Sequence, residues 1–431
     1  MKKLSVIMPS LNVADYIREA VESVIRQTLS DIEIICVDAG STDGTREIIE
    51  ELAGKDQRIM VVISPVRSYG FQVNMGLDRA SGEYVAILET DDHVDKDMYR
   101  ELCELADRAE ADYVKCDYCT YYTGENGERV YTKRKISGNR SLYEESFVPG
   151  DHAETATEDW YLWNGVYRTE FLKRNGISFS ETKGAAFQDI GFLHKTTAAA
   201  GNARYLDRPL YMYCVGRGEA SSKSDKTLEF VRNEYGMLIN GMEDSASQNE
   251  LRLLYRRMAK SFVRACQDSS DDALSEESNK QRCVDLWKWL KDAEKGGYVS
   301  ADALPDGMRT DYIRLMDDPG AFPGYRKEKR QELSDFLAEG KDIVIFGCGD
   351  IGRNAYFYLT REGYKISGFM DNNPSLWGKD TMGVTVYAPA EVKTFSPDTS
   401  YVIANEKYAE DISRQLEELR PGVRMYKYSP L

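Results

Sequence analysis

The sequence lacks a long apolar segment at its start, an excess of positive charge and a cysteine-rich framework. Its first residues, MKKLSVIMPSLN, hold an apolar run that is too short and too soon interrupted for a signal peptide or a membrane span. Eight cysteines are scattered over 431 residues, which is typical of a reducing cytoplasm and not of a disulfide scaffold. We therefore predict a cytoplasmic protein, and peripheral association with the inner face of the membrane stays open.

A net charge of −16 excludes broad binding to nucleic acid, because a phosphate backbone requires a basic surface. An acidic chain that handles an anionic ligand must do so locally, through a metal ion or a few well-placed cations. Cys116 and Cys119 form a C-x-x-C pair, but no second pair or nearby histidine completes a zinc site. With 42% hydrophobic and 30% charged residues, the composition is typical of a globular protein of two or three domains.

Strand and helix signals alternate at the start of the chain. The apolar strand candidates are LSVIM, IEIICV and IMVVIS, and helices are predicted from Tyr16 and from Thr45. The first helix carries apolar residues at helical spacing on one face, namely Ile17, Ala20, Val21, Val24 and Ile25. This alternation predicts a parallel sheet covered by helices on both faces, with ligands bound beyond the carboxyl ends of its strands.

Three zones follow from these signals: a first domain over residues 1–226, a helical region over 227–330 and a third domain over 331–431. The third zone contains DIVIFGCGDIGRNAYFYL, in which Gly347, Gly349 and Gly352 form a glycine turn between a strand and a helix. Asp371 ends the next strand candidate. This is the dinucleotide-binding fingerprint in its expected context, and it predicts a Rossmann-like α/β domain.

Four carboxylates gather after an apolar run in YVAILETDDHVD, namely Glu89, Asp91, Asp92 and Asp95. Like charges repel and each is costly to bury, so a positive charge is expected to compensate them. Asp38 ends another strand candidate in VDAGSTDGT, where Gly40 and Gly44 allow a sharp turn. Because both stretches follow strands of a parallel sheet, we expect the two acidic loops to lie at one edge, beside MPSLN.

These ordered motifs resemble family 2 glycosyltransferases of the GT-A fold. The residues that carry the resemblance are, in order, Pro9 to Asn12, Ser23, Gln27–Thr28, Val37 to Thr45, Asn74, Gly76, Gly82–Tyr84 and Glu89 to Asp92. The sequence departs from the family pattern at Leu11, Ala39, Val73 and Gln188, where an aromatic residue, Asp, Arg and Glu are usual. The predicted fold class is α/β: a GT-A nucleotide-sugar-binding domain, a helical middle region and a C-terminal Rossmann-like domain.

The resemblance implies a nucleotide-sugar site and a divalent cation, Mg²⁺ or Mn²⁺, held by Asp91 and Asp92. A hard cation prefers oxygen ligands and commonly bridges protein carboxylates to substrate phosphates. The donor-binding residues that it implies are Pro9, Ser10, Leu11, Asn12, Asp38, Arg67, Asn74, Glu89, Thr90, Asp91, Arg217 and Lys223. Asp38 matches the family's base-contacting Asp and favours a uridine nucleotide, although the substituted positions leave the donor base open.

Asp189 in FQDIGF matches the carboxylate that acts as catalytic base in inverting members of the family. Its alternative role is that of a helix N-cap, which Asp commonly fills. Trp160 and Trp163 lie in the same part of the chain. Stacking on a sugar ring and plain core packing are equally open for these two residues.

The predicted function is a metal-dependent, inverting transfer of a sugar from a nucleotide-sugar, with a UDP-sugar favoured, in surface glycan biosynthesis. The acceptor is expected to be a saccharide, a lipid-linked molecule or a protein, and a homo-oligomer stays open. Two alternatives rest on the third domain: a nicotinamide-dependent oxidoreductase, and a non-catalytic module that binds a nucleotide-sugar. Against the oxidoreductase, no catalytic His or Tyr/Lys arrangement follows the glycine turn.

Overall fold

The computed structural model of the chain describes residues 2–123, 127–152, 154–184, 187–215, 226–242, 246–340 and 342–430. The chain divides into two compact units, Met1–Met258 and Ala259–Leu431. The division falls within α10 (Gln248–Asp268), a helix of the predicted middle region. The domain boundaries predicted near residues 226 and 330 stay predictions, and each compact unit is described by itself.

The first unit is built on a sheet whose opening half is parallel. Its strands β1 (Leu4–Ser10), β2 (Ile32–Asp38), β3 (Ile59–Ile63) and β4 (Tyr84–Ile87) lie in the order β3-β2-β1-β4. Every residue of β1 and β4 is buried, as expected for parallel strands covered on both faces. Ser10, Asp38 and Ile87 therefore end neighbouring strands at one edge of the sheet.

The other half of this sheet is mixed, which differs from the parallel sheet predicted. Its strands are β8 (Gly165–Arg168), β6 (Tyr113–Thr123), β9 (Ala203–Cys214), β5 (His93–Val94) and the edge strand β7 (Arg129–Arg134). β8 enters from the edge at which β4 ends, and so it runs antiparallel to both β4 and β6. Because β9 is parallel to β6, both strands run in the direction of β4 and end at the same edge.

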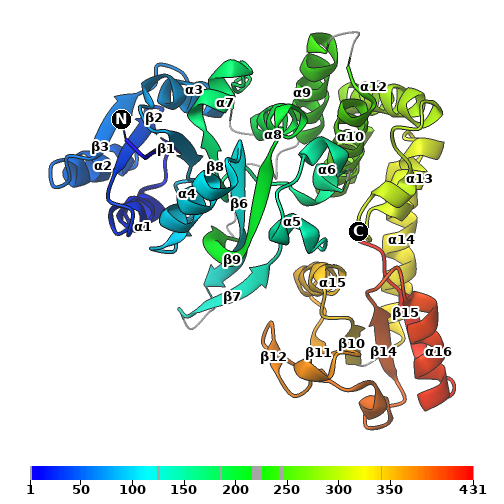
Figure 1. Cartoon of the computed structure of the whole chain (residues 1–431). Helices are drawn as coiled ribbons and strands as arrows, with labels where there is room; N and C mark the ends of the chain where they lie inside the picture. Colours follow the sequence, from blue (N-terminus) through cyan, green and yellow to red (C-terminus); the bar gives the residue numbers. More distant parts are fainter. Residues whose placement is uncertain are drawn as a thin grey trace. The chain divides into compact units, whose positions relative to one another are not determined.

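Helices cover both faces of this sheet (Figure 1). They are α1 (Ala14–Ile25), α2 (Thr45–Ala53), α3 (Tyr69–Arg79), α4 (Met98–Ala109), α8 (Gln188–Ala199) and α9 (Thr227–Gly241), with the short α5 (Ser141–Glu144), η1 (Pro149–Asp151), α6 (Thr155–Glu158) and α7 (Thr169–Arg174). The predicted apolar face of α1 is confirmed, because its residues from Ile17 to Val24 are buried at the predicted positions and Ile25 packs on the same core. α1 lies beside α2, whereas α3 packs on β1 and β2 and contacts α8.

The second unit combines helices with a small sheet. Its helices after α10 are α11 (Asp271–Ser275), α12 (Glu277–Lys295), η2 (Ala301–Ala303), α13 (Arg309–Asp317), α14 (Phe322–Ala338), α15 (Asp350–Arg361), η3 (Pro374–Leu376), η4 (Pro389–Lys393) and α16 (Ala409–Leu419). Its strands are β10 (Asp342–Phe346), β11 (Ile366–Met370), β12 (Asp380–Thr381), β13 (Val384–Tyr387), β14 (Thr399–Ile403) and β15 (Arg424–Lys427). The five parallel strands lie in the order β13-β11-β10-β14-β15, the order of a doubly wound nucleotide-binding fold, which confirms the Rossmann-like prediction.

Buried apolar side chains form a separate core in each unit. One core surrounds the larger sheet, and two cores that include Val344 and Ile345 flank the smaller one, as expected when helices cover both of its faces. Among the residues that the structure describes, no helix is both long enough and apolar enough to span a membrane. The cytoplasmic location stays a prediction.

Candidate functional site

The candidate site lies where β1, β2 and β4 end, and its first part is the turn after β2. The buried carboxylate of Asp38 accepts hydrogen bonds from the backbone N–H groups of Gly40 (2.9 Å) and Ser41 (3.1 Å), and from the Ser41 hydroxyl. Gly40 and Gly44 have φ angles of +81° and +100°, left-handed values that glycine adopts without steric cost. Asp38 therefore shapes the turn that a ligand at this edge would meet.

Hydrogen bonds join this turn to the loop after β1. The Asn12 side chain accepts a hydrogen bond from the N–H of Thr42 at 2.9 Å, and the Asn12 N–H donates to Ser41 Oγ at 3.0 Å. Asp43 accepts a hydrogen bond from the N–H of Ala14 at 2.9 Å, and so satisfies a donor in the first turn of α1. The two predicted loops therefore form one rigid arrangement, in which Asp43 has an organising role that the sequence analysis missed.

Gln72 ties the ends of β1 and β2 together from α3. Its buried amide group donates hydrogen bonds to the carbonyl oxygens of Ser10 (2.9 Å) and Val37 (2.7 Å). The sequence analysis did not single out Gln72. A polar residue next to the apolar Val73 inside an amphipathic helix is the signal that could have marked it, because a buried amide requires partners.

Hydrogen bonds anchor the acidic turn after β4 to β1 and to α3. The Thr90 hydroxyl donates a hydrogen bond to the carbonyl oxygen of Pro9 at 2.9 Å, and Glu89 accepts one from the Tyr69 hydroxyl at 2.6 Å. Burial, followed by the charges of Glu89 and Asp189, raises the pKa of Tyr69 well above its ordinary value. Tyr69 therefore lies within electrostatic reach of both the acidic turn and the start of α8.

Asp92 faces the sheet. It is 2% exposed, and its two carboxylate oxygens accept hydrogen bonds from the N–H of Cys214 (2.7 Å) and the hydroxyl of Tyr211 (2.8 Å), both on β9. Burial raises its pKa well above the ordinary value. Asp91 is half-buried beside it. Asp92 therefore fixes the turn through β9, and the metal roles predicted for Asp91 and Asp92 stay predictions.

The oxygen ligands of this turn fit a hard divalent cation. Across the described ranges, no three His, Cys, Asp or Glu side chains come together as a metal site of their own. A cation here would therefore depend on one or two carboxylates together with oxygens of a bound ligand. Mg²⁺ is commonly held in this way at substrate phosphates, and Mn²⁺ accepts the same oxygen ligands.

Gln188 holds the beginnings of α3 and α8 together. Its side-chain oxygen accepts a hydrogen bond from the N–H of Gly70 at 2.9 Å, and its amide donates to Thr182 Oγ1 at 2.7 Å. A Cβ atom at Gly70 would clash with the carbonyl oxygen of Ser180, so the close approach requires glycine. Gln188, which stands where Glu is usual in the family, therefore has a structural role in this protein.

Asn74 holds the same segment from the next turn of α3. Its amide donates hydrogen bonds to the carbonyl oxygen of Phe179 at 3.0 Å and to Glu181 at 2.9 Å, and its oxygen accepts one from the N–H of Phe179 at 3.0 Å. These bonds use the polar groups of Asn74 within the protein. The donor contact predicted for Asn74 stays a prediction.

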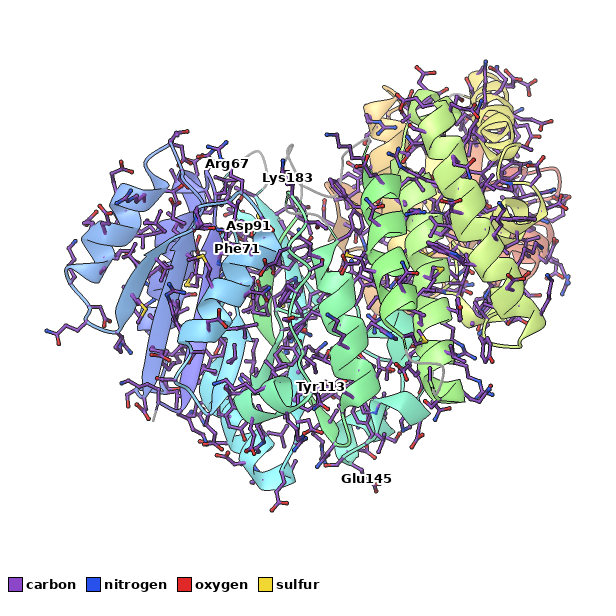
Figure 2. The ribbon with its side chains drawn as sticks, turned by 90° about the horizontal axis from the view of Figure 1, so that it is seen from above. Arg67, Phe71, Asp91, Tyr113, Glu145 and Lys183 are labelled. Carbon is purple, nitrogen blue, oxygen red and sulfur yellow. The ribbon has the colours of Figure 1, made fainter. Side chains whose placement is uncertain are left out.

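Arg67 places a cation at the turn after β2, where its guanidinium donates to the carbonyl oxygen of Gly40 at 3.2 Å. Figure 2 shows Arg67, Asp91 and Lys183 on one side of the first unit. Of the other donor-binding predictions, Pro9 is buried and Leu11 is half-buried at the end of β1. Two further predicted cations lie outside the described residues, namely Arg217 and Lys223.

Asp189 is the second residue of α8 and is half-buried. The N-cap of α8 is Phe187, with a φ angle of +68°, so the alternative prediction that Asp189 is the N-cap is wrong. Burial raises the pKa of Asp189 to about 6. The backbone N–H groups of the first turn and the charge of Arg257 act in the opposite direction and lower the pKa, but burial has the larger effect. A carboxyl group with this pKa is ionised at neutral pH and can accept a proton.

An aromatic cluster lies beside Asp92, with members on β6, on β9 and in the segment before β8. Its members are Tyr118, Tyr161, Trp163, Tyr211 and Tyr213. Trp163 is 5% exposed and stacks on Tyr211 and Tyr161 with ring centroids 4.0 and 4.5 Å apart, so it packs in the core. Tyr118, Tyr161 and Tyr213 are half-buried, as is Trp160. Aromatic surface next to the acidic turn therefore comes from tyrosines that the sequence analysis did not single out.

The glycine turn of the second unit has the predicted context. Gly347 has a φ angle of +111°, and Gly349 is the N-cap of α15. A Cβ atom at Gly352 would clash with the carbonyl oxygen of Gly347, so this glycine allows close packing of helix and turn. Asp371 accepts hydrogen bonds from the N–H groups of Cys348 and Asn373, both at 2.8 Å. The turn is thus braced by Asp371, and its ligand stays unassigned.

Comparison with known proteins bears on both units. The family described as Glycosyl transferase family 2 matches residues 5–163, and the one described as C2185-like, N-terminal matches residues 339–428. The chain is 33% identical over 211 residues to the uncharacterized glycosyltransferase EpsJ of Bacillus subtilis, covering 49% of this chain and 60% of EpsJ. It is 31% identical over 236 residues to the uncharacterized glycosyltransferase YibD of Escherichia coli, covering 54% of this chain and 67% of YibD. The chain therefore covers less than two thirds of EpsJ.

A solved structure shares the fold. The structure of S. aureus TarS 1-349 in complex with UDP-GlcNAc has a TM-score of 0.54 and 20% sequence identity, and the match covers 77% of this chain and 92% of that one. The predicted fold class is confirmed: an α/β GT-A domain with a mixed sheet, a helical middle and a small C-terminal α/β domain.

Proposed function

Because the chain belongs to glycosyltransferase family 2, a family of glycosyltransferase enzymes, we propose that it transfers a sugar from a nucleotide-sugar to an acceptor hydroxyl, with inversion and with a divalent cation. The proposal depends on one observation: the Asp38 turn and the 89–92 turn follow neighbouring strands at one sheet edge. Tyr69 donates a hydrogen bond to Glu89 of the second turn, and the charge of Asp189 acts on the same Tyr69 hydroxyl. Such a transfer requires a donor pocket, compensation for the charge of the leaving group and a base.

The loops joined by Asn12 and Asp38 are the proposed nucleotide pocket. Their mutual hydrogen bonds order the backbone before a ligand binds, which lowers the entropic cost of binding. Arg67 adds a cation at the same turn. The structures of TarS in complex with UDP and with UDP-GlcNAc support a uridine nucleotide as the donor.

Asp91 is proposed to hold Mg²⁺ or Mn²⁺ together with the diphosphate of the donor. When bound, such a cation stabilises the negative charge that develops on the leaving diphosphate. Asp92 is proposed to hold the turn in place through its two hydrogen bonds to β9. Glu89, oriented by Tyr69, is proposed to face the donor ribose or the outer shell of the cation.

Asp189 is proposed as the general base. In a single displacement, the acceptor oxygen attacks the anomeric carbon while the diphosphate leaves from the opposite face, and the acceptor proton passes to a carboxylate. A positioned base of this kind contributes roughly 10²–10⁴ in rate. Asp91 is less suited to this role, because it is proposed to hold the cation at the leaving group.

The acceptor is proposed to be a saccharide, free or carried on a lipid or protein. The half-buried Tyr161 and Tyr213 lie at the carboxyl edge of the sheet beside Asp92, where the acceptor half of the site would be. Aromatic rings combine an apolar face with a polar tip, which suits contact with sugar rings. The place of the reaction in surface glycan biosynthesis stays a prediction.

The direct test is incubation of the chain with a panel of UDP-sugars and Mn²⁺ while the release of UDP is measured. Asp189→Asn is expected to lose most turnover while its calorimetric affinity for UDP stays near that of the unaltered chain, because a base acts mainly in the transition state. Asp91→Asn is expected to lose the Mn²⁺-dependent part of UDP affinity. Asp95→Asn, four residues along the same stretch, is the control and is expected to retain both properties.

Two results would refute this proposal. The first is that the chain neither binds UDP nor releases it from any common UDP-sugar. The second is near-normal transfer in Asp189→Asn, which would remove Asp189 from the mechanism. If Asp92→Asn lowers Mn²⁺-dependent affinity as much as Asp91→Asn does, Asp92 contributes to cation binding as well as to the turn.

The second unit is proposed to have a supporting, non-catalytic role, such as nucleotide-sugar binding, docking or self-association. Asp371 is the residue expected to bind a ribose in a nicotinamide enzyme. Each of its two carboxylate oxygens already accepts a hydrogen bond from a backbone N–H group. Titration of the full chain with NAD(H) is expected to show no binding. Micromolar binding of NAD(H) would favour the oxidoreductase instead.

A further inference from the structure

A buried carboxyl group lies against α8, the helix whose first turn holds Asp189. Glu234 of α9 is 4% exposed, and it accepts a hydrogen bond from Ser180 Oγ at 2.7 Å. Gly191 of α8 has no side chain, and a Cβ atom there would clash with Glu234 Oε1, so the carboxyl group packs directly against the backbone of α8. Within the described residues, no Lys or Arg forms an ion pair with Glu234.

The surroundings of the two carboxyl groups differ in how well they stabilise a negative charge. Asp189 is half-buried in the first turn of α8, where backbone N–H groups and the helix dipole favour an anion. The positive charge of Arg257 acts on Asp189 in the same direction. Glu234 is more deeply buried and has one neutral hydroxyl and the backbone of Gly191 as partners. Ionisation therefore costs less at Asp189 than at Glu234.

Few other charges act on this pair. Lys195 of α8 attracts Glu234, but its ammonium group is exposed and bonds to the carbonyl oxygen of Ser178 at 3.0 Å. His194 of α8 is buried, and burial lowers its pKa to about 3, so it is neutral at working pH. Tyr69 of α3 is also neutral, because its pKa is raised. Among these described groups, Asp189 and Glu234 are therefore the two whose charge can change near neutral pH.

We propose that Asp189 and Glu234 titrate as one carboxyl pair in which Asp189 ionises first, and that Glu234, while it stays protonated, is a positioning residue for the base. The link to transfer rests on the proposed function, whereas the pairing itself does not. Burial and, to a smaller extent, the charge of Asp189 together raise the pKa of Glu234 to about 7. In many enzymes, two carboxyl groups take different acid and base roles because their surroundings give them different pKa values.

The pairing predicts an alkaline limit for transfer. Above about pH 7, ionised Glu234 is a second anion, without an ion-pair partner among the described residues, against the backbone of Gly191, two residues after Asp189. Like charges repel, so we expect the repulsion to displace the first turn of α8, which carries Asp189. Transfer is therefore expected to rise as Asp189 ionises near pH 6 and to decline as Glu234 ionises.

The activity test compares pH profiles of transfer with a UDP-sugar and Mn²⁺. Glu234→Gln keeps a neutral side chain of nearly the same shape, and it is expected to move the alkaline decline up by at least about one pH unit while the acidic limb, set by Asp189, keeps its midpoint. Asp311→Asn is the control, because Asp311 is a buried carboxyl group of the second unit with pKa raised by burial to about 6. It is expected to retain the unaltered profile. An unchanged profile in Glu234→Gln would mean a purely structural role and would overturn the proposal.

A second test requires no substrate and measures unfolding of the first unit against pH, by hydrogen exchange of peptides from α8 and α9. Both carboxyl groups have raised pKa values, so the stability that they contribute is fully present below about pH 4 and is lost as pH rises through about 6 and 7. Glu234→Gln is expected to abolish the upper part of this loss. Asp189→Asn is expected to move the remaining loss to lower pH, because the repelling charge is gone.

The two tests separate the pairing from the proposed function. If the remaining loss in Asp189→Asn keeps the midpoint found in the unaltered chain, the two carboxyl groups do not interact and the proposal is refuted. If the coupling is present but no UDP-sugar is turned over, the pairing stands and the proposed function fails. Asp311→Asn is expected to alter the exchange of second-unit peptides alone.

Discussion

A buried ion pair in the first unit leads to a quantitative prediction about stability. Lys115 Nζ lies 2.6 Å from Asp159 Oδ1 and 2.9 Å from the carbonyl oxygen of Tyr161, and both charged side chains are 1% exposed. The Tyr205 hydroxyl donates to the other carboxylate oxygen at 3.1 Å. Arg257 is fully buried and donates to the backbone carbonyl oxygen of Asp159 at 3.1 Å. The region therefore holds two buried cations and one buried anion.

The two single substitutions are expected to differ in cost because of Arg257. Removing one partner of a buried ion pair typically costs about 3–5 kcal/mol of unfolding free energy, because the other charge is left uncompensated. Lys115→Met leaves Asp159 near the charge of Arg257, so we expect the lower end of this range. Asp159→Asn leaves two buried cations without an anion, so we expect the upper end. The double variant retains the net charge of the original cluster and is expected to cost less than Asp159→Asn alone.

The assay is urea-dependent hydrogen exchange of peptides from β6 and β8, which reports on the first unit separately from the second. Burial already lowers the pKa of Lys115, and loss of Asp159 removes the partner that opposes this shift. A cation whose folded pKa is lowered destabilises the fold at low pH, so Asp159→Asn is expected to regain stability as pH rises toward the ordinary lysine pKa of about 10.4 and Lys115 becomes neutral. The reasoning fails if Lys115→Met is the more costly substitution, or if Asp159→Asn gains nothing at high pH.

Three further predictions concern close contacts. Gly70→Ala places a methyl group against the carbonyl oxygen of Ser180, so it is expected to lower the unfolding free energy of the first unit by about 1–3 kcal/mol and to weaken UDP binding. Unchanged UDP binding would show that this contact does not support the site. Gly352→Ala meets the carbonyl oxygen of Gly347, so a lower thermal midpoint of the second unit is expected, and an unchanged midpoint contradicts the packing described. Asp371→Asn leaves one of two backbone N–H groups poorly satisfied, and loss of about 1–3 kcal/mol is expected in denaturant titrations that follow the second unit.

The sequence alone was enough to place the parallel strands and the loops that follow them. The apolar runs at β1, β2 and β4 are nearly continuous, interrupted by Ser5 and Glu33, because these strands are buried on both faces. Such runs can be recognised without an alignment. The glycine turn of the second unit could also be recognised from the sequence, because Gly347 and Gly352 meet local requirements of backbone conformation and close packing. These features are set by neighbours along the chain, or by a strand and the helix that follows it.

The tertiary structure decided which polar groups of these motifs are engaged by distant parts of the protein. Asp91 and Asp92 are adjacent and look alike in the sequence, yet Asp92 is engaged by Tyr211 and Cys214, more than a hundred residues away. Gln27 is a second case: its amide group bonds to the carbonyl oxygen of Asp95, which fixes the loop before α4. Hydrogen bonds between distant segments follow no periodic pattern, so spacing along the chain could not reveal them.

The same reason accounts for the carboxyl pair behind the candidate base. Asp189 was visible in its motif, but its half-buried position follows from the left-handed N-cap at Phe187 and from the packing of α8 on α3 and α9. Glu234 lies in a helix that shows no chemical motif, and its burial depends on Gly191 of another helix. The protonation state of a carboxyl group depends on the water and charge around it in three dimensions, and those surroundings exist only once the helices have packed.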